Sequence, residues 1–187
     1  MLHEFSGHRL LHPLVEQHHS DKHKDVISPD TIVLHYTAAF NSTAHLLDSP
    51  NVSAHFVVRR DGTIDQLFPC NIKCWHAGRS VHKGRKFVNN FSIGIEIENL
   101  GIMNEVTSDG GFTWFKKFVF DKDLVKVGSD KWHKYNGVEI GATFLLCSLL
   151  IAEYGIKDIV GHSEIASGRK VDPGVLFPLD SFRKALL

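Results

Sequence analysis

Residues 138–154 read VEIGATFLLCSLLIAEY, an almost uninterrupted apolar stretch. A helix with apolar side chains on nearly all sides is typical of a helix buried against other structure. Gly155 follows the stretch directly, and glycine is the residue type that most often ends a helix. We therefore expect a helix over 138–154 that packs against a β-sheet.

The sequence around this helix predicts the strands of that sheet. Residues 30–38 read DTIVLHYTA, a β-branched run that predicts a buried strand carrying His35 to a sheet edge. In FSIGIEIEN (91–99) the residues alternate, so that the isoleucines share one face and Ser92, Gly94, Glu96 and Glu98 the other. IKDIVGHSE (156–164) predicts a short strand ending at a histidine, His162. Asp61-Gly62 supplies the turn of a hairpin predicted over 52–69.

The remaining segments complete a single α/β domain over residues 26–187. Residues 41–48 predict a short helix, 73–90 a surface loop, 107–135 a second hairpin or excursion, and 179–187 a small amphipathic helix. Helices and strands interleave, which favours a central mixed β-sheet flanked by helices. The histidine-rich residues 1–25 have little apolar periodicity, and we expect a polar N-terminal arm there.

Composition excludes several classes of protein. Lys+Arg and Asp+Glu number 21 each, so no basic surface for nucleic acid is expected. We find no signal peptide and predict no membrane span, so we expect synthesis in the cytoplasm. The site of action is left open between the cell wall, after release, and the cytosol. We also expect a monomer. Cys147 is expected in the core, whereas the CxxxC spacing of Cys70 and Cys74 leaves a local disulfide undecided.

The segment GHSEIASGRKVDPG (161–174) combines with the strand ends into a possible metal site. His35 and His162 each end a predicted strand, and Asp172 lies on a loop able to fold back to the same point. Two imidazoles and one carboxylate leave one position of a tetrahedral zinc ion open for water, as in a catalytic site. From the residues alone, a capped strand end and a turn aspartate before Pro173 explain the pattern equally well.

Two further groups near these histidines have possible chemical roles. Glu96 could serve as a general base, but Glu98 lies on the same strand face and periodicity does not choose between them. Lys170 alternates with Asp172 and could stabilise a developing oxyanion, although most lysines lie at the surface without such a role. His76 and Tyr36 are candidate substrate-binding residues, with structural roles as the alternative for both.

Five segments that occur in order are more specific than any of these residues alone: VLHYTA (33–38), SAHFVVRRDGTIDQ (53–66), WHAG (75–78), NNFSIGIEIEN (89–99) and GHSEIASGRKVDPG (161–174). Together they resemble the zinc-dependent N-acetylmuramoyl-L-alanine amidases of the amidase-2 family, akin to phage lysozyme-type amidases and peptidoglycan recognition proteins. The resemblance covers about residues 31–180. It implies that His35, His162 and Asp172 bind one Zn²⁺, that Glu96 is the acid/base residue, and that Lys170 supports the transition state.

The resemblance also implies an activity. We expect hydrolysis of the amide between N-acetylmuramic acid and L-alanine in peptidoglycan or its fragments, with an endolysin-like, bacteriolytic setting favoured over recycling. A non-catalytic peptidoglycan-binding module is the alternative, as is a zinc hydrolase that acts on another amide. Recognition-only relatives typically lack one or more zinc ligands, and all three are present here, which favours an enzyme.

Overall fold

The computed structural model describes residues 4–187, and a six-stranded sheet lies at its centre. Its strands are β3 (Val15–Gln17), β4 (Thr31–Tyr36), β5 (Phe56–Val58), β6 (Ile64–Gln66), β9 (Ser92–Ile97) and β15 (Asp158–Gly161). They are ordered β15-β4-β9-β5-β6-β3, and every neighbouring pair is parallel except the hairpin β5–β6. The sheet is therefore mixed, as predicted.

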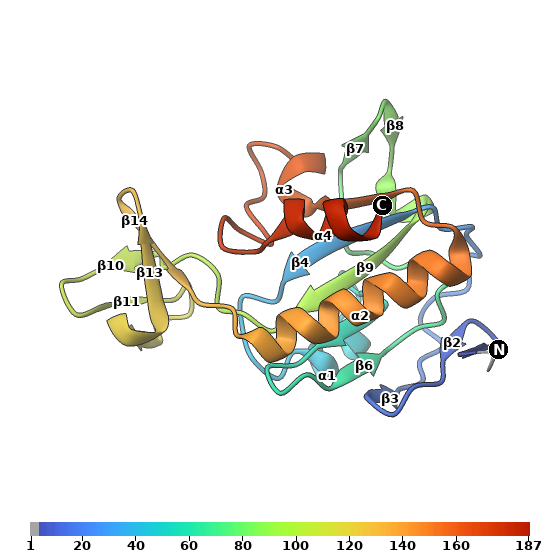
Figure 1. Cartoon of the computed structure of the whole chain (residues 1–187), viewed down its shortest axis with the longest axis horizontal. Helices are drawn as coiled ribbons and strands as arrows, with labels where there is room; N and C mark the ends of the chain where they lie inside the picture. The colour runs from blue at the N-terminus through green and yellow to red at the C-terminus, as the bar shows by residue number, and fades with distance from the viewer. Residues whose placement is uncertain (1–3) are drawn as a thin grey trace.

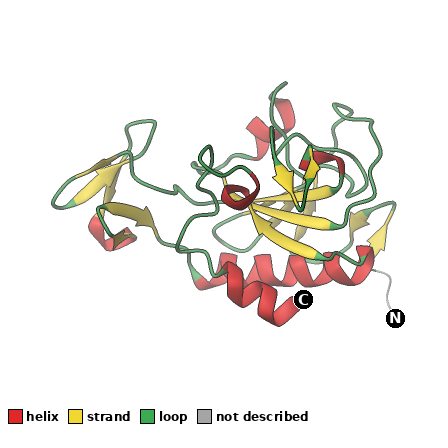
Figure 2. Cartoon of the chain, turned by 90° about the horizontal axis from the view of Figure 1, so that it is seen from above, coloured by secondary structure: helices red, strands yellow, loops and turns green. Residues whose placement is uncertain are grey.

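Four helices accompany the sheet: α1 (Thr43–Asp48), α2 (Gly137–Tyr154), α3 (His162–Ile165) and α4 (Leu179–Leu186). α2 runs along one face of the sheet, with α4 beside it (Figure 1; Figure 2 shows the sheet between these helices and the loops of the other face). α2 begins with a capping box between Asn136 and Glu139 and ends at Gly155, whose φ of 62° is in the left-handed region. These are the boundaries expected from the sequence.

The main apolar core lies between α2 and the sheet. Alternation along β4 and β9 turns Ile32, Leu34 and the three isoleucines of β9 toward the helix, where all are fully buried. Leu146 of α2 packs into the same cluster with 0% exposure. The opposite face of β4 and β9 is thereby left for the polar residues, which fixes where the site lies.

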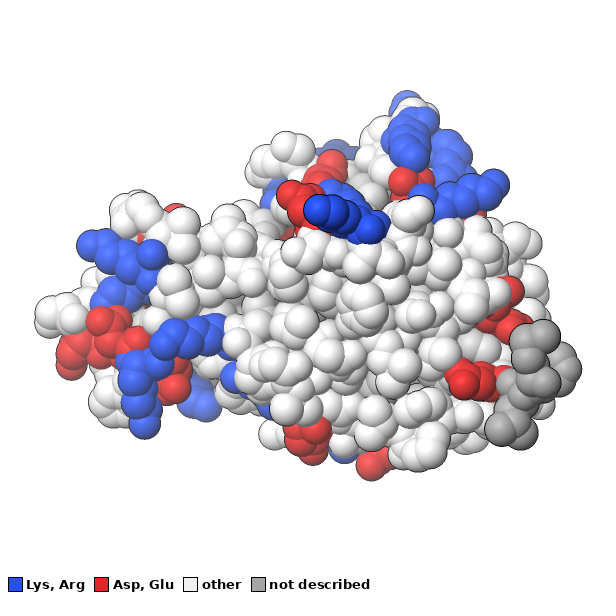
Figure 3. Space-filling view, in the orientation of Figure 1, with Lys and Arg blue, Asp and Glu red and all other residues white. Residues whose placement is uncertain are grey.

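The outer side of α2 differs from the predicted all-round burial. Val138 is 58% exposed, and Figure 3 shows an uncharged surface over the helix. By length and composition, α2 also qualifies as a possible membrane span, although none was predicted. Its packing against the sheet and α4 gives the physical reason for its apolar sequence: it is the main core helix of this domain.

Residues 4–25 do not form the predicted polar arm. β1 (Phe5–Ser6) and β2 (Arg9–Leu10) form a small hairpin, and β3 pairs in parallel with β6 as the edge strand of the central sheet. Leu10 lies in the main core and is only 1% exposed. The prediction failed because β3 is too short and polar to show a strand pattern, and its partner strand supplies the stabilising contacts.

Two segments project from the domain (Figure 1). One is the hairpin β7 (Val81–His82) and β8 (Arg85–Lys86), followed by the 3-10 helix Val88–Asn90. The other is the predicted excursion, which contains the sheet β10 (Glu105–Val106), β11 (Gly110–Phe112) and β12 (Phe118–Phe120), a 3-10 helix (Asp121–Asp123), and the hairpin β13 (Leu124–Val127) and β14 (Asp130–His133).

The cysteines are all buried and carry no disulfide. Cys147 lies in the α2 core as predicted. Cys70 and Cys74 are free thiols in different apolar clusters, one on each side of the sheet. The local disulfide that the spacing left undecided is therefore absent, and both cysteines are core residues. Cys74 and its neighbours His76 and Ala77 also show that 73–90 is only partly a surface loop, since these three residues are buried.

Candidate active site

A cleft of about 880 Å³ opens at the carboxyl ends of β4, β9 and β15. Open α/β sheets commonly bind ligands at this edge, because consecutive strands deliver their following residues to one place. His35 lies near the end of β4, and His162 begins α3 directly after β15. Both line the cleft together with Asp172, so the structure brings together the three residues proposed as metal ligands.

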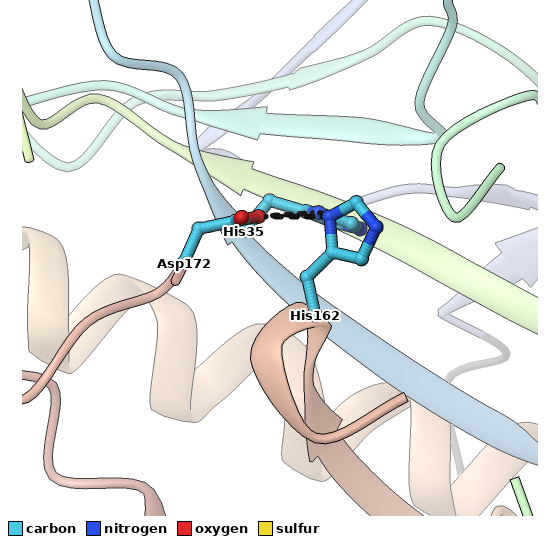
Figure 4. A group of neighbouring side chains, drawn as sticks. All are labelled: His35, His162 and Asp172. Carbon is cyan, nitrogen blue, oxygen red and sulfur yellow. Dashed lines mark hydrogen bonds and ion pairs between the residues drawn. The ribbon is translucent and has the colours of Figure 1, made fainter. Parts of the chain in front are cut away.

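These three side chains form a compact triangle (Figure 4). His35 Nδ1 lies 2.9 Å from both His162 Nδ1 and Asp172 Oδ2, and His162 Nδ1 lies 3.0 Å from the same oxygen. The backbone holds the loop in place, because the Ser163 N–H donates to the Asp172 carbonyl at 2.9 Å. The loop that the sequence predicted to fold back to His162 does so.

The chemistry of the triangle fits a metal cation. His162 Nε2 lies 3.1 Å from the Ala77 carbonyl, which only accepts, so this nitrogen carries the proton. The other nitrogen, Nδ1, faces the Asp172 carboxylate, and a metal cation held between a lone pair on this nitrogen and the carboxylate oxygen would satisfy both. Burial lowers the pKa of His35, which favours the neutral, ligating form of that ring. Zinc bonds of about 2.0–2.1 Å separate tetrahedral ligands by about 3.3 Å, slightly more than these distances.

Glu96 lies beside this triangle in the floor of the cleft. It is the register partner of His35 on the neighbouring parallel strand, so both side chains leave the same face of the sheet. Its Oε2 is buried and has no hydrogen-bond partner among the described residues. Burial and the charge of Asp172 raise its pKa well above the ordinary value, and Lys170 opposes that shift. A carboxyl group with no structural partner and a raised pKa is suited to proton transfer.

Glu98, the competing carboxylate, is bound to the backbone instead. Its Oε1 accepts from the Asn41 N–H at 2.6 Å, and its Oε2 from the Arg60 N–H at 3.4 Å. Glu98 lies beyond the last residue of β9 and is absent from the residues that line the main cleft. Geometry therefore separates the two glutamates that the alternation left equivalent.

The other charged residues of 161–174 divide into two groups. Lys170 is exposed at the rim of the cleft. Glu164 accepts from the Gly161 N–H at 2.8 Å and pairs with Arg183, and Arg169 donates to the Ala77 and Arg79 carbonyls at 3.0 and 2.9 Å. Glu164 and Arg169 thus hold the local backbone, whereas Lys170 lines the cleft and its ammonium group has no hydrogen-bond or ion-pair partner within residues 4–187.

The two predicted substrate residues are placed differently. His76 lines the cleft but is only 9% exposed, and its Nδ1 lies 3.1 Å from Nε2 of His35. Tyr36 borders the cleft, but alternation turns its ring to the opposite sheet face from His35, where it packs over Gly101. Its ring has a packing role there, and substrate contact by Tyr36 stays a prediction.

Sequence reasoning missed three residues that shape the site. Ser92 and Gly94 share a strand face with Glu96, and both lie against His76: Ser92 Oγ is 3.2 Å from His76 Nε2, and a Cβ on Gly94 would fall 2.4 Å from the ring. The small residues of SIGIE were the available signal. Trp114, from the excursion, lines the cleft while 62% exposed, and no local pattern indicated that it returns to the site.

Known proteins resemble this chain in both sequence and fold. Residues 25–175 match the family described as N-acetylmuramoyl-L-alanine amidase. The amidase AmiD of Escherichia coli is 36% identical over 79% of this chain and 49% of its own length. The 1,6-anhydro-N-acetylmuramyl-L-alanine amidase AmpD of the same species is 34% identical over 77% of this chain and 61% of its own. The chain thus spans about half to three fifths of the length of these relatives.

Solved structures agree with the sequence matches. A crystal structure of an AmpD derivative covers 97% of this chain and 98% of its own with a TM-score of 0.69 and 25% identity. The complex of E. coli AmiD with anhydro-N-acetylmuramic acid-L-Ala-D-γ-Glu-L-Lys covers 85% of this chain and 58% of its own with a TM-score of 0.66 and 32% identity. Since the family match spans five of the six strands of the central sheet and the whole cleft triangle, this chain belongs to the N-acetylmuramoyl-L-alanine amidase family.

Proposed function

We propose that this protein is a zinc-dependent amidase that cleaves the bond between N-acetylmuramic acid and L-alanine in peptidoglycan or its fragments. The observation that carries the proposal is the convergence of His35, His162 and Asp172 on one point, beside a glutamate that lacks a structural partner. The family match supports the reaction, and the ligand set of two imidazoles and one carboxylate, which suits zinc, supports the choice of cofactor.

The proposed zinc ion would be bound by His35 Nδ1, His162 Nδ1 and Asp172 Oδ2. When bound, it supplies Lewis acidity, which polarises a carbonyl group and lowers the pKa of water. Glu96 takes the proton from the attacking water and returns it to the leaving alanine nitrogen. Because its pKa is raised by burial and by Asp172, Glu96 holds a proton more readily than an ordinary carboxylate, as this double role requires. Lys170 balances the negative charge that develops on the carbonyl oxygen.

The outer wall of the cleft favours a substrate larger than a dipeptide. Trp114 extends over the cleft from the excursion, and its indole N–H donates to the Ala38 carbonyl at 3.1 Å. Most of the ring remains exposed and free to contact a ligand. An indole surface at the mouth of a polar cleft is suited to the apolar face of a sugar ring or peptide stem. We assign this wall to the part of the muropeptide distant from the scissile bond.

Anhydro-muropeptides are the first substrates to test. The relatives that share 33–36% identity are AmiD and AmpD proteins, and a named AmiD complex contains such a compound. The predicted endolysin-like setting has weaker support, because a similar structure named as an endolysin shares 18% identity and so bears on the fold alone. Comparing cleavage of soluble muropeptides with cleavage of intact sacculi separates the two settings.

The test of the proposal is the mass of the reaction products. Purified protein incubated with anhydro-N-acetylmuramyl-tripeptide should release the intact tripeptide and the free sugar, and Glu96→Gln should release neither at a comparable rate. Binding of the muropeptide without any cleavage would support the non-catalytic alternative and contradict the proposal. Cleavage at another amide would identify a different hydrolase.

A further inference from the structure

A buried chain of hydrogen bonds runs from the proposed metal site into the domain. His35 Nε2 lies 3.1 Å from His76 Nδ1, and His76 Nε2 lies 3.2 Å from Ser92 Oγ. The Ser92 hydroxyl donates in turn to the Val88 carbonyl at 2.7 Å. All three side chains are buried, so the polar atoms of this chain satisfy one another.

Which atom donates in each of these hydrogen bonds follows from the bond between Ser92 and the Val88 carbonyl. The Val88 carbonyl only accepts, so the single hydroxyl proton of Ser92 is committed to it. Ser92 Oγ can then only accept from His76, which places a proton on His76 Nε2. Within the described part of the chain, His76 contacts no carboxylate that would stabilise a second proton, so its Nδ1 carries a lone pair. That lone pair accepts from His35 Nε2–H, and the other nitrogen of His35, Nδ1, is left unprotonated.

The same segment acts on the second histidine. The Ala77 carbonyl accepts from His162 Nε2–H, which orients the ring so that His162 Nδ1 faces Asp172. Asn89 holds this segment by accepting from the N–H groups of His76 and Ala77 at 3.2 and 2.8 Å. Adjacent residues of one loop therefore direct both imidazoles to turn Nδ1 toward the same point.

Strand β9 is shaped to admit the His76 ring. A Cβ built on Gly94 would lie 2.4 Å from the ring, closer than any side-chain contact allows, so the ring occupies the space that glycine leaves. Ser92 and Gly94 share the face of β9 that carries Glu96. One strand face thus supplies the acid/base residue, the space for His76 and the hydroxyl that orients it.

We infer that His76 is a positioning residue that fixes the tautomer and orientation of His35 for metal binding, with Ser92 fixing His76. This inference rests on the metal site of the proposed function and gives His76 a role other than the predicted substrate contact. Residues that bond to the far side of a ligating imidazole commonly contribute about 10–100-fold to metal affinity. His76→Leu should therefore weaken zinc binding by about this factor.

The experiment measures zinc affinity by competition with a chromogenic chelator, and the imidazole tautomers by long-range ¹H–¹⁵N NMR. His76→Gln keeps an oxygen that can accept from His35 and should bind zinc more tightly than His76→Leu. Ser92→Ala should weaken zinc binding by a smaller factor and shift His35 away from the Nε2–H tautomer. Thr143→Val is the matched control, because it also deletes one buried hydroxyl but lies in α2 on the other side of the sheet.

The outcomes separate this inference from the proposed function. If the unmodified protein binds no zinc, the proposed function itself fails. If it binds zinc while His76→Leu and Ser92→Ala bind equally well and keep the His35 tautomer, the positioning role is contradicted. A raised KM for muropeptide with unchanged zinc affinity in folded His76→Leu would support substrate contact by His76 and overturn the inference.

Discussion

The two faces of strands β4 and β9 bury different kinds of side chain. Toward α2, the strands present isoleucine and leucine, which need only volume and an apolar neighbour. On the other face, every second position except Val33 carries a polar or very small residue, and His35, Ser92 and Glu96 are each bound to a particular partner or aimed at the cleft. The first face should therefore control stability and the second activity, and variants on the two faces can test this division.

The largest expected effect is on the polar face. Glu96→Gln should lower kcat by about 10²–10⁴-fold, the usual contribution of a general acid/base. Its free energy of unfolding should not fall, because Glu96 Oε2 has no hydrogen-bond partner to lose. Muropeptide turnover and urea unfolding of the same sample measure both quantities.

Glu98→Gln is the matched control for Glu96. It should keep nearly full kcat and lose about 1 kcal/mol of unfolding free energy, because Glu98 accepts two backbone N–H groups. Loss of activity in the Glu98 variant with full activity in the Glu96 variant would exchange the two roles and invalidate the assignment.

On the apolar face, Leu146→Ala should lower the free energy of unfolding by about 2–5 kcal/mol, the cost of removing a fully buried leucine side chain. Zinc affinity should be unchanged at temperatures where the variant stays folded. Leu149→Ala, on the same helix but only partly buried, should cost clearly less. Urea unfolding measures both, and equal losses would mean that the core does not lie where the structure puts it.

His55 gives the polar face a dependence of stability on pH. Burial lowers its pKa from 6.5 to about 4, although its Nε2–H donates to the Ile72 carbonyl, and the buried neighbours His23 and His76 face it. Between those pH values the unfolded chain takes up a proton that the folded chain does not. The free energy of unfolding should therefore fall as pH falls from about 6.5 to 4, with a contribution of up to about 3 kcal/mol from His55.

His55→Gln tests this contribution, because an amide side chain can keep the bonds to the Gly94 N–H and the Ile72 carbonyl without titrating. When urea unfolding is measured between pH 4 and 7, the free energy of unfolding should change less with pH in the variant than in the unmodified protein. An identical dependence of the unfolding free energy on pH in both proteins would mean that a group other than His55 causes the acid sensitivity.

The smallest expected effect concerns the cleft wall. Trp114→Ala should raise KM for muropeptides by a few-fold, equivalent to about 1 kcal/mol, because it removes an exposed aromatic contact. kcat and stability should change little. Phe120→Ala, an equally exposed aromatic of the excursion that is absent from the cleft lining, is the control in steady-state kinetics. A KM for the Trp114 variant similar to that of the unmodified protein would argue against substrate contact by this wall.

The division between the faces also explains what the sequence could predict. Alternation in FSIGIEIEN identified both faces of β9, and the apolar run 138–154 identified the helix that covers one of them. These features depend on a period within one segment, which is visible without knowledge of the partners. The ligand set was recognised because separate motifs occur in a fixed order, rather than from any single segment.

Features that depend on distant partners were missed. β3 joins the sheet through its pairing with β6, and nothing in its own polar sequence predicts a strand. The direction of the Tyr36 ring follows from the register of β4, and the roles of His76 and Ser92 emerge only once residues 75–78 are packed against β9. In each case tertiary contacts, and not local propensity, decide the structure.

The central claim is that one zinc ion at His35, His162 and Asp172 is required for amide cleavage. The most direct test removes the metal with a chelator, restores zinc stepwise, and measures bound zinc and released tripeptide in each sample. If zinc is required for cleavage, activity is lost without metal and rises in proportion to bound zinc up to one ion per chain, with neither zinc binding nor activity in His162→Ala. Full activity in metal-free protein, or zinc binding that persists unchanged in His162→Ala, would contradict it.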